Sequence, residues 1–189
     1  GIALLGVQPA AEALSNRPGG RARMGMAKDA PSRAAMKLEE ALEWLGVGPE
    51  PGDRAIDLGA APGGWTYLLA ERRCTVIAVD LGRLRPDIAA RKNVAYVKAS
   101  AFDFAPDEPV DWLLCDMAWR PLEVCAMLAR WGRSRWARTL VANIKLPMKR
   151  KVEFLPRIRE IIESGGWRDL RMRHLYHDRE EITLTAWSR

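Results

Sequence analysis

The chain has no long hydrophobic run, few cysteines and almost no histidine among its 189 residues. No stretch of about 18 uncharged apolar residues occurs, which excludes a transmembrane helix. The opening segment GIALLGV is too short for the core of a signal peptide and has no basic residue before it. The sequence does not begin with methionine, so we expect a processed or truncated piece of a longer protein.

The cysteines and histidines are too few and too scattered for a zinc site or a disulfide framework. Cys74, Cys115 and Cys125 lie in apolar surroundings without CxxC spacing, and the histidines are His174 and His177. Buried, reduced thiols in a cytoplasmic protein are the plain expectation. We therefore expect no metal and no membrane partner, and favour a monomer.

The formal net charge is +6, and arginine supplies most of the basic residues. Guanidinium groups bind phosphates in bidentate fashion, so this balance suits a nucleic acid, although arginine-rich composition can also be a genomic bias. Residues 1–33 hold five basic and two acidic residues, which leaves +3, half of the total. Residues 1–31 are predicted to be a basic arm or linker, with or without RNA contacts, and residues 32–189 the folded domain.

Helical and strand-like patterns alternate from Ser32 onwards. The first predicted helix begins with this capping-type serine and stops at Gly46. Further helices are predicted over 63–73, 121–136 and 152–166. Strands are predicted over 54–58, 74–80, 93–99, 110–117, 137–146, 167–176 and 180–188, of which the last two form a hairpin.

This alternation predicts an α/β fold with a mostly parallel sheet covered by helices on both faces. Ligands of such sheets bind at the carboxyl ends of the strands, where the strand order reverses. In the last predicted helix an apolar face is expected, with Pro156 near its start or at a kink. That face consists of Val152, Leu155, Ile158, Ile161 and Ile162.

The segment DLGAAPGGW, residues 57–65, joins the first predicted strand to the following helix. Its glycines leave room for backbone N–H groups to face a ligand. Its spacing differs from the GxGxxG of dinucleotide enzymes, and Pro62 removes an N–H donor that a phosphate would use. About 20 residues further on, Asp80 ends the second strand, where an acid can accept both hydroxyls of a ribose. A nucleoside with an amino-acid tail and no phosphate describes S-adenosylmethionine.

Five segments together resemble the FtsJ-type RNA 2′-O-ribose methyltransferases, and most closely their large-subunit ribosomal RNA methyltransferase M subgroup. These are DLGAAPGGWTYLL, DAPSRAAMKLEEA, CDM, NIKLPMKRK and LYHDREEITL, running from about Asp29 to the C-terminus. The resemblance implies a Rossmann-like class I methyltransferase fold with a seven-stranded sheet. It also implies S-adenosyl-L-methionine as cofactor and a cytidine ribose of large-subunit ribosomal RNA as substrate. The subgroup has an N-terminal RNA-binding region with a THUMP-like part, so we expect either a catalytic fragment or a chain that retains only the arm.

The family's Lys-Asp-Lys-Glu tetrad maps to Lys37, Asp116, Lys145 and Glu181. The resemblance implies that Lys145 removes the hydroxyl proton, while the two acids orient the lysines and the hydroxyl. Since Lys145 sits in an otherwise apolar strand, VANIKLP, we expect burial and the neighbouring Lys37 to lower its pKa. Glu180 stays in reserve for Glu181, because adjacent strand residues face opposite sides and the alternation does not say which side meets the site.

The resemblance also implies a set of cofactor contacts. Ser100 departs from the family, which commonly has an acid there to hold the adenine amino group, and Asp103 is an alternative. Ser32 has a second interpretation as a plain helix cap. The full predicted set is Ser32, Asp57, Gly59, Ala60, Ala61, Pro62, Gly63, Gly64, Trp65, Asp80, Ser100 and Asp116.

Two basic stretches are candidates for RNA contacts. In the first, tryptophans that could stack on bases alternate with arginines, although an amphipathic helix with a solvated face gives the same pattern. The second follows the predicted strand 137–146 and is better placed to hold substrate phosphates. The first comprises Trp131, Trp136, Arg130, Arg133, Arg135 and Arg138, and the second Lys149, Arg150 and Lys151.

Three alternative functions remain open. The first is a methyltransferase of the same fold with another target, which could be another RNA. A small molecule or a protein as that target would explain the glycine loop but not the two lysines or the positive charge. A non-catalytic RNA-binding protein is disfavoured because all four tetrad positions are filled. A nicotinamide oxidoreductase fits least, given Pro62 and the loop spacing.

Overall fold

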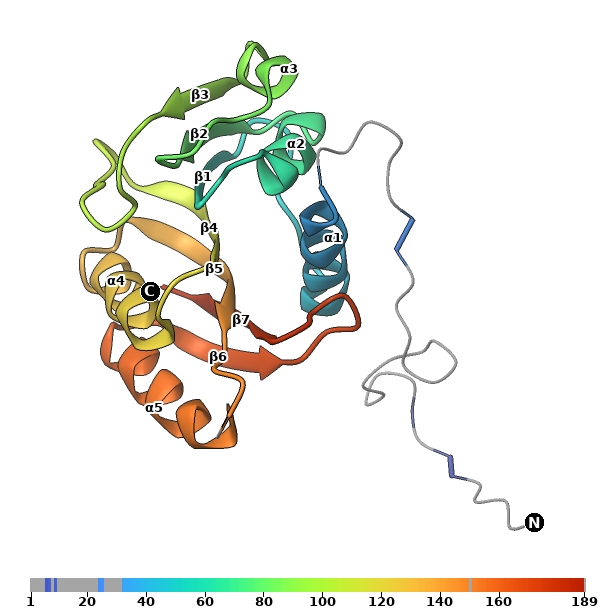
Figure 1. The fold of residues 1–189 in the computed structure, drawn as a ribbon, viewed down its shortest axis with the longest axis vertical. Helices are drawn as coiled ribbons and strands as arrows, with labels where there is room; N and C mark the ends of the chain where they lie inside the picture. The colour runs from blue at the N-terminus through green and yellow to red at the C-terminus, as the bar shows by residue number, and fades with distance from the viewer. Residues whose placement is uncertain (1–5, 8, 10–23, 26–31, 150, 189) are drawn as a thin grey trace.

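The computed structural model describes residues 32–149 and 151–188, together with residues 6–7, 9 and 24–25. Within this part of the chain, one seven-stranded sheet lies between two layers of helices (Figure 1). The predicted basic arm falls almost wholly outside the described residues.

The order of elements follows the alternation that the sequence predicts. The helices are α1 (Ala34–Leu45), α2 (Gly64–Glu71), α3 (Pro86–Ala89), α4 (Pro121–Arg133) and α5 (Lys151–Ser164). The strands are β1 (Arg54–Leu58), β2 (Thr75–Val79), β3 (Val94–Val97), β4 (Val110–Met117), β5 (Ala137–Lys145), β6 (Arg168–Arg173) and β7 (Glu181–Trp187).

The sheet has the strand order β3-β2-β1-β4-β5-β7-β6. The five strands β1 to β5 are parallel, whereas β7 runs antiparallel between β5 and β6. This arrangement confirms the predicted mostly parallel sheet with a terminal hairpin. The strand order reverses between β1 and β4, so a ligand crevice is expected at the carboxyl ends of these two strands.

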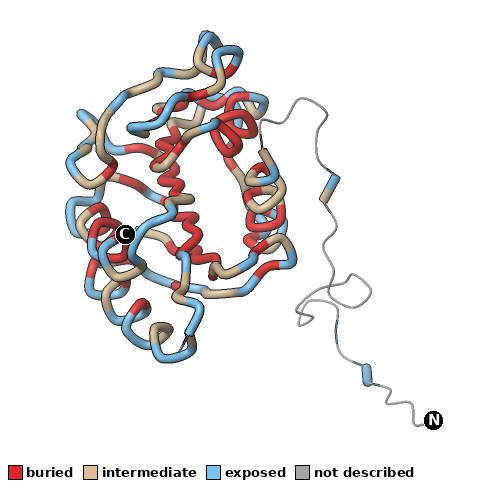
Figure 2. Tube along the Cα trace, in the orientation of Figure 1, coloured by how far each residue is buried: buried red, intermediate tan, exposed pale blue. Residues whose placement is uncertain are grey.

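Two apolar layers bury the faces of the sheet. On one face, α1 and α2 pack through Leu38 and Leu69, and on the other, α4 and α5 pack through Leu128, Ile158 and Ile162. Figure 1 shows these helix pairs on opposite sides of the sheet, and Figure 2 shows that the buried segments follow the central strands and the inward helix faces. The parallel strands are therefore covered on both sides, as their continuous apolar runs require.

Two helices differ in detail from the sequence prediction. Helix α1 begins at Ala34, although the Ser32 hydroxyl does accept the backbone N–H of Ala34 at 3.2 Å. In α5, Pro156 lies inside the helix and Ile158 and Ile162 are buried. Val152 is 76% exposed, so its assignment to the apolar face was wrong. It lies in the first turn of α5, beyond the end of the packed interface.

Neither a bilayer-crossing helix nor a metal-binding group is found within the described residues. No described helix combines the length and apolar character needed to cross a bilayer. These residues also contain no group of three or more His, Cys, Asp or Glu side chains able to hold a metal ion. Cys74, Cys115 and Cys125 are free and buried, and burial raises the pKa of the Cys74 thiol to about 11.

Candidate active site

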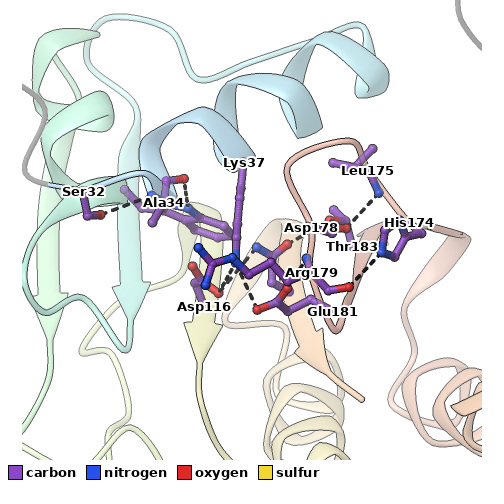
Figure 3. Close-up of polar contacts among 12 residues, drawn as sticks. Ser32, Ala34, Lys37, Asp116, His174, Leu175, Asp178, Arg179, Glu181 and Thr183 are labelled. Atoms are coloured by element: carbon purple, nitrogen blue, oxygen red, sulfur yellow. Dashed lines mark hydrogen bonds and ion pairs between the residues drawn. The ribbon is translucent and has the colours of Figure 1, made fainter. Parts of the chain in front are cut away.

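Three residues of the predicted tetrad meet at the carboxyl edge of the sheet (Figure 3). The Lys37 Nζ atom, from α1, lies 3.2 Å from Glu181 Oε1 and 3.9 Å from Asp116 Oδ1. Asp116 is near the carboxyl end of β4, and Glu181 is the first residue of antiparallel β7. Because β7 runs antiparallel to β5, its first residue lies at the same edge as the carboxyl ends of β4 and β5. Lys37 reaches this edge from α1.

The Asp116 carboxyl is largely withdrawn from solvent, with 22% of its side chain exposed. Burial raises its pKa above the ordinary value, and Glu181 acts in the same direction. Lys37, the Asn143 amide and Lys145 oppose this rise but do not cancel it. A partly buried acid with a raised pKa beside a lysine and a second acid is the arrangement expected of a functional site rather than a surface ion pair.

Glu181 is held by the backbone as well as by Lys37. Its Oε2 atom accepts the N–H of Arg179 at 2.6 Å. Burial raises the pKa of the Glu181 carboxyl, but the Arg179 N–H and Lys37 outweigh it, so the pKa lies below its ordinary value. The reserve candidate Glu180 pairs instead with Lys151, away from this cluster. Of the two adjacent acids, only Glu181 lies beside Lys37.

Lys145 is the last residue of β5 and lies opposite Glu181 in the β5–β7 register. The expectation that this lysine is buried was wrong, because its side chain is exposed. Lys145 ends the strand where the sheet edge opens to solvent, so the apolar residues that precede it in sequence do not cover it. Among the described residues it forms no ion pair, in contrast to Lys37, which is held by two carboxylates.

A buried polar chain behind Asp116 was not predicted from the sequence. The Asn143 amide of β5 donates to Asp116 Oδ1 at 3.5 Å and accepts the Thr183 hydroxyl at 2.9 Å. The Thr183 oxygen also lies 3.0 Å from Asp178 Oδ2, which accepts the Leu175 N–H. Burial raises the pKa of Asp178 to about 6. These contacts tie β4, β5 and β7 together immediately behind the site.

Glu40 is a further residue that sequence reasoning missed. It lies one turn after Lys37 on α1 and is 5% exposed. Its two carboxylate oxygens accept the backbone N–H groups of Tyr176 at 2.6 Å and His177 at 2.9 Å. The only sequence signal is an acid beside the apolar stripe of a helix, and its partners are more than 130 residues away. Glu40 therefore fixes α1 to the segment that precedes Glu181.

The glycines of the predicted cofactor loop allow close packing of the backbone. At Gly59, which has φ +80°, a Cβ atom would lie 2.6 Å from Met117 Cγ and 3.3 Å from the Asp116 carbonyl oxygen. A Cβ at Gly64 would meet the Ser32 hydroxyl at 2.5 Å. The absence of a side chain at Gly59 therefore lets the loop pack against the end of β4. The absence of one at Gly64 leaves room for Ser32, just before α1.

Two acids flank this loop and differ in their surroundings. Asp57 is buried beneath it and accepts the Thr66 hydroxyl at 2.6 Å. Asp80 is partly exposed at the end of β2, and its oxygens accept the N–H groups of Ala61 at 2.9 Å and Gly82 at 2.6 Å. A carboxylate oxygen can accept more than one hydrogen bond, so Asp80 retains capacity for a diol.

The remaining predicted cofactor residues fall into two groups. Trp65 is buried and its indole N–H donates to the Ala34 carbonyl at 2.8 Å, so its side chain belongs to the α1–α2 contact. Pro62 is exposed at the tip of the loop and Ser100 is partly exposed after β3, where its hydroxyl accepts the Phe102 N–H. Ala60, Ala61 and Gly63 lie in the same loop, and Asp103 is exposed.

The first predicted RNA-binding stretch lies away from this site. Trp131 is fully buried in α4 and packs against Phe104 and Trp136, so of the two interpretations of this stretch the amphipathic helix holds for Trp131, and its ring is not available to bases. This stretch joins the end of α4 to the start of β5, which is the opposite edge of the sheet from the tetrad. In the second stretch Lys149 is exposed, Lys151 pairs with Glu180, and Arg150 lies outside the described residues.

Sequence comparisons connect the chain to one family. Residues 30–130 match the family described as FtsJ-like methyltransferase. The chain is 45% identical over 172 residues to a ribosomal RNA large subunit methyltransferase M of Halorhodospira halophila, covering 89% of this chain and 50% of that protein. A protein of the same name from Xanthomonas oryzae is 42% identical, with 97% of this chain and 55% of that protein covered. The chain thus spans about half the length of these relatives.

Solved structures share the fold at low sequence identity. A SAM-dependent methyltransferase from Aquifex aeolicus aligns with a TM-score of 0.57 and 20% identity, covering 84% of this chain and 93% of that one. A magnesium protoporphyrin IX methyltransferase from Synechocystis, solved with bound SAM, gives a TM-score of 0.62 and 16% identity, with 88% and 87% covered. These similarities support a class I methyltransferase fold.

Proposed function

Because this chain belongs to the FtsJ-like methyltransferase family, we propose that it is an S-adenosylmethionine-dependent RNA methyltransferase that acts on a ribose 2′-hydroxyl. The observation that carries the proposal is the cluster of Lys37, Asp116 and Glu181 at the carboxyl edge, with Lys145 beside Glu181. Its relatives are named as large-subunit ribosomal RNA methyltransferases, so that RNA is the proposed substrate. The resemblance of its motifs to the methyltransferase M subgroup implies a cytidine ribose as the target within it.

The residues at the switch point fit S-adenosylmethionine. Gly59 brings a loop without long side chains against the end of β4, where a Cβ atom would collide with Met117. Asp80 lies at the end of the neighbouring strand, with acceptor capacity for ribose hydroxyls. We propose that these residues hold the nucleoside and that the partly buried Asp116 lies close to the methyl group of the cofactor. When bound, the cofactor supplies a methyl group on a sulfonium sulfur.

The lysines have different surroundings, which supports a division of their roles. Lys37 lies between two carboxylates, so it is suited to fixing Asp116 and Glu181 relative to one another. Lys145 is exposed, beside Glu181, and without an ion pair among the described residues. Lys145 is the group proposed to take the proton of the ribose hydroxyl, and Glu181 the group proposed to orient that hydroxyl.

The direct test is to incubate the chain with labelled S-adenosylmethionine and undermethylated large-subunit ribosomal RNA. We expect label in the RNA, and mapping of the product should locate the methyl group on a ribose 2′-oxygen. Label on a base would contradict the ribose assignment, and label on protein alone would contradict an RNA substrate.

Lys145 offers a sharper test, because two substitutions separate proton removal from simple charge. Lys145→Ala should lower kcat by about 10²–10⁴-fold, as expected for loss of a general base, with little change in cofactor affinity. Lys145→Arg keeps a positive charge but cannot accept a proton, so it should be as defective as Lys145→Ala. If Lys145→Arg retains turnover, Lys145 acts through its charge and the base assignment is wrong.

A further inference from the structure

A cavity opens directly beside the tetrad, between the start of α1 and the segment that connects β6 to β7. Its volume is about 780 Å³, and Lys37 and Glu181 form part of its wall. Tyr176 and Arg179, from the connecting segment, line the same space. The role proposed above for the tetrad does not use either of these side chains.

Tyr176 presents its side chain to solvent from a fixed backbone. The residue is 46% exposed. Its N–H and that of His177 donate to the two oxygens of the buried Glu40 carboxylate, and its ring meets the His177 ring edge-on with 5.1 Å between centroids. Because α1 also carries Lys37, the same contact fixes Tyr176 relative to the tetrad.

The connecting segment is fixed on the other side of Tyr176 as well. Asp178 is 7% exposed, and its Oδ2 atom accepts the Leu175 N–H at 2.9 Å and lies 3.0 Å from the Thr183 hydroxyl. The buried carboxylates of Glu40 and Asp178 thus fix the backbone of residues 175–178, while the Tyr176 side chain remains partly exposed. Preorganisation of this kind lowers the entropic cost of binding a partner.

The charge around the cavity favours an anionic partner. Arg33 and Arg179 are exposed and line it, together with Lys37. The acidic side chains that face it are Glu181, which is paired with Lys37, and Asp178, which is hydrogen-bonded within the segment. An exposed ring in a cavity that Arg33 and Arg179 also line matches a nucleotide, with its flat base and its charged phosphates.

We propose that this cavity binds the nucleotide adjacent to the target ribose in single-stranded RNA, with its base stacked on Tyr176 and its phosphates held by Arg33 and Arg179. This inference rests on the proposed function in that it takes RNA as the substrate. It adds a substrate subsite formed by residues outside the tetrad and outside the glycine loop. Stacking supplies affinity without dependence on the base, because every base has a flat face.

The test compares binding of two fluorescein-labelled oligomers of about ten nucleotides, measured by fluorescence anisotropy. One is single-stranded RNA of mixed sequence, and the other is an abasic strand with the same phosphates. Tyr176→Ala should weaken binding of the RNA about tenfold and leave binding of the abasic strand unchanged, whereas Tyr176→Phe should bind both like the wild type. Arg179→Ala should weaken binding of both strands.

The possible results distinguish a failure of the proposed subsite from a failure of the proposed function. The subsite is wrong if the wild type does not bind the RNA, if Tyr176→Ala binds it like the wild type, or if Tyr176→Phe is as weak as Tyr176→Ala. If Tyr176→Ala weakens RNA binding but the wild type methylates no RNA, the subsite stands and the catalytic proposal fails. In an active preparation Tyr176→Ala should raise KM for RNA about tenfold, with kcat and cofactor affinity unchanged.

Discussion

Asp57 is a buried carboxyl group at the point where β1 leads into the glycine loop. Burial raises its pKa from 3.8 to about 7, and the charges of Asp116 and Asp80 add to this rise, while the Thr66 hydroxyl opposes it. Since the pKa is higher in the folded state than in the unfolded state, the folded chain binds more protons between these two values. The free energy of unfolding therefore falls as pH rises from about 4 to about 7.

Asp57→Asn should remove this contribution while keeping an acceptor for Thr66. The variant should match the wild type in stability near pH 4 and exceed it at pH 8, by roughly 2–4 kcal/mol. Urea unfolding at both pH values measures the free energy of unfolding of the variant and of the wild type. Asp103→Asn, at an exposed position, is the control and should unfold with the same free energy as the wild type at both pH values. If the wild type and Asp57→Asn lose the same free energy of unfolding between pH 4 and pH 8, ionisation of Asp57 does not destabilise the fold and the prediction is wrong.

At the scale of elements, the two helices that cover one face of the sheet approach through glycine. A Cβ atom at Gly165, just after α5, would lie 2.5 Å from Ala129 Cα and 2.7 Å from the Ala129 carbonyl oxygen of α4. Because both contacts are with backbone, Gly165→Ala forces α4 and α5 apart and should cost about 1–3 kcal/mol. Thermal unfolding followed by circular dichroism measures this loss.

Gly48→Ala is the matched control for that substitution. A Cβ atom at Gly48 would also meet an atom at 2.7 Å, but this atom is Arg72 Nη1, at the end of a flexible side chain. The arginine can move aside, so the change in stability should stay within about 0.5 kcal/mol. Equal losses from Gly165→Ala and Gly48→Ala would mean that the α4–α5 contact is not the cause.

The elements could be predicted from sequence because their apolar periods are local. All seven strands were recognised from short apolar runs, whereas α3, with four residues, was too short to show a helical period. The apolar run before Lys145 correctly predicted a strand. It did not show where along that strand burial ends, so the exposure of Lys145 was not predicted. Glu40 has partners far away in the chain, and nothing in its own neighbourhood reveals them.

At the scale of the whole molecule, exposed basic residues gather at both edges of the sheet. Arg33 and Arg179 lie at the carboxyl edge beside the tetrad. Arg133 and Arg138 are exposed at the amino edge, where α4 ends and β5 begins. The net charge of +6 therefore does not by itself indicate which edge meets RNA. Under the proposed function the position of the tetrad does, because the target ribose would have to reach it.

Salt dependence distinguishes the two edges. For single-stranded nucleic acid, each phosphate contact contributes about 0.7 to the slope of log affinity against log salt concentration. The double variant Arg33→Ala/Arg179→Ala should therefore flatten that slope by about 1.4, whereas Arg133→Ala/Arg138→Ala removes the same charge and should leave it unchanged. Anisotropy titrations over a series of salt concentrations measure the slopes. If Arg133→Ala/Arg138→Ala flattens the slope as much, RNA also contacts the amino edge. The proposal that RNA binds at the carboxyl edge alone is then wrong.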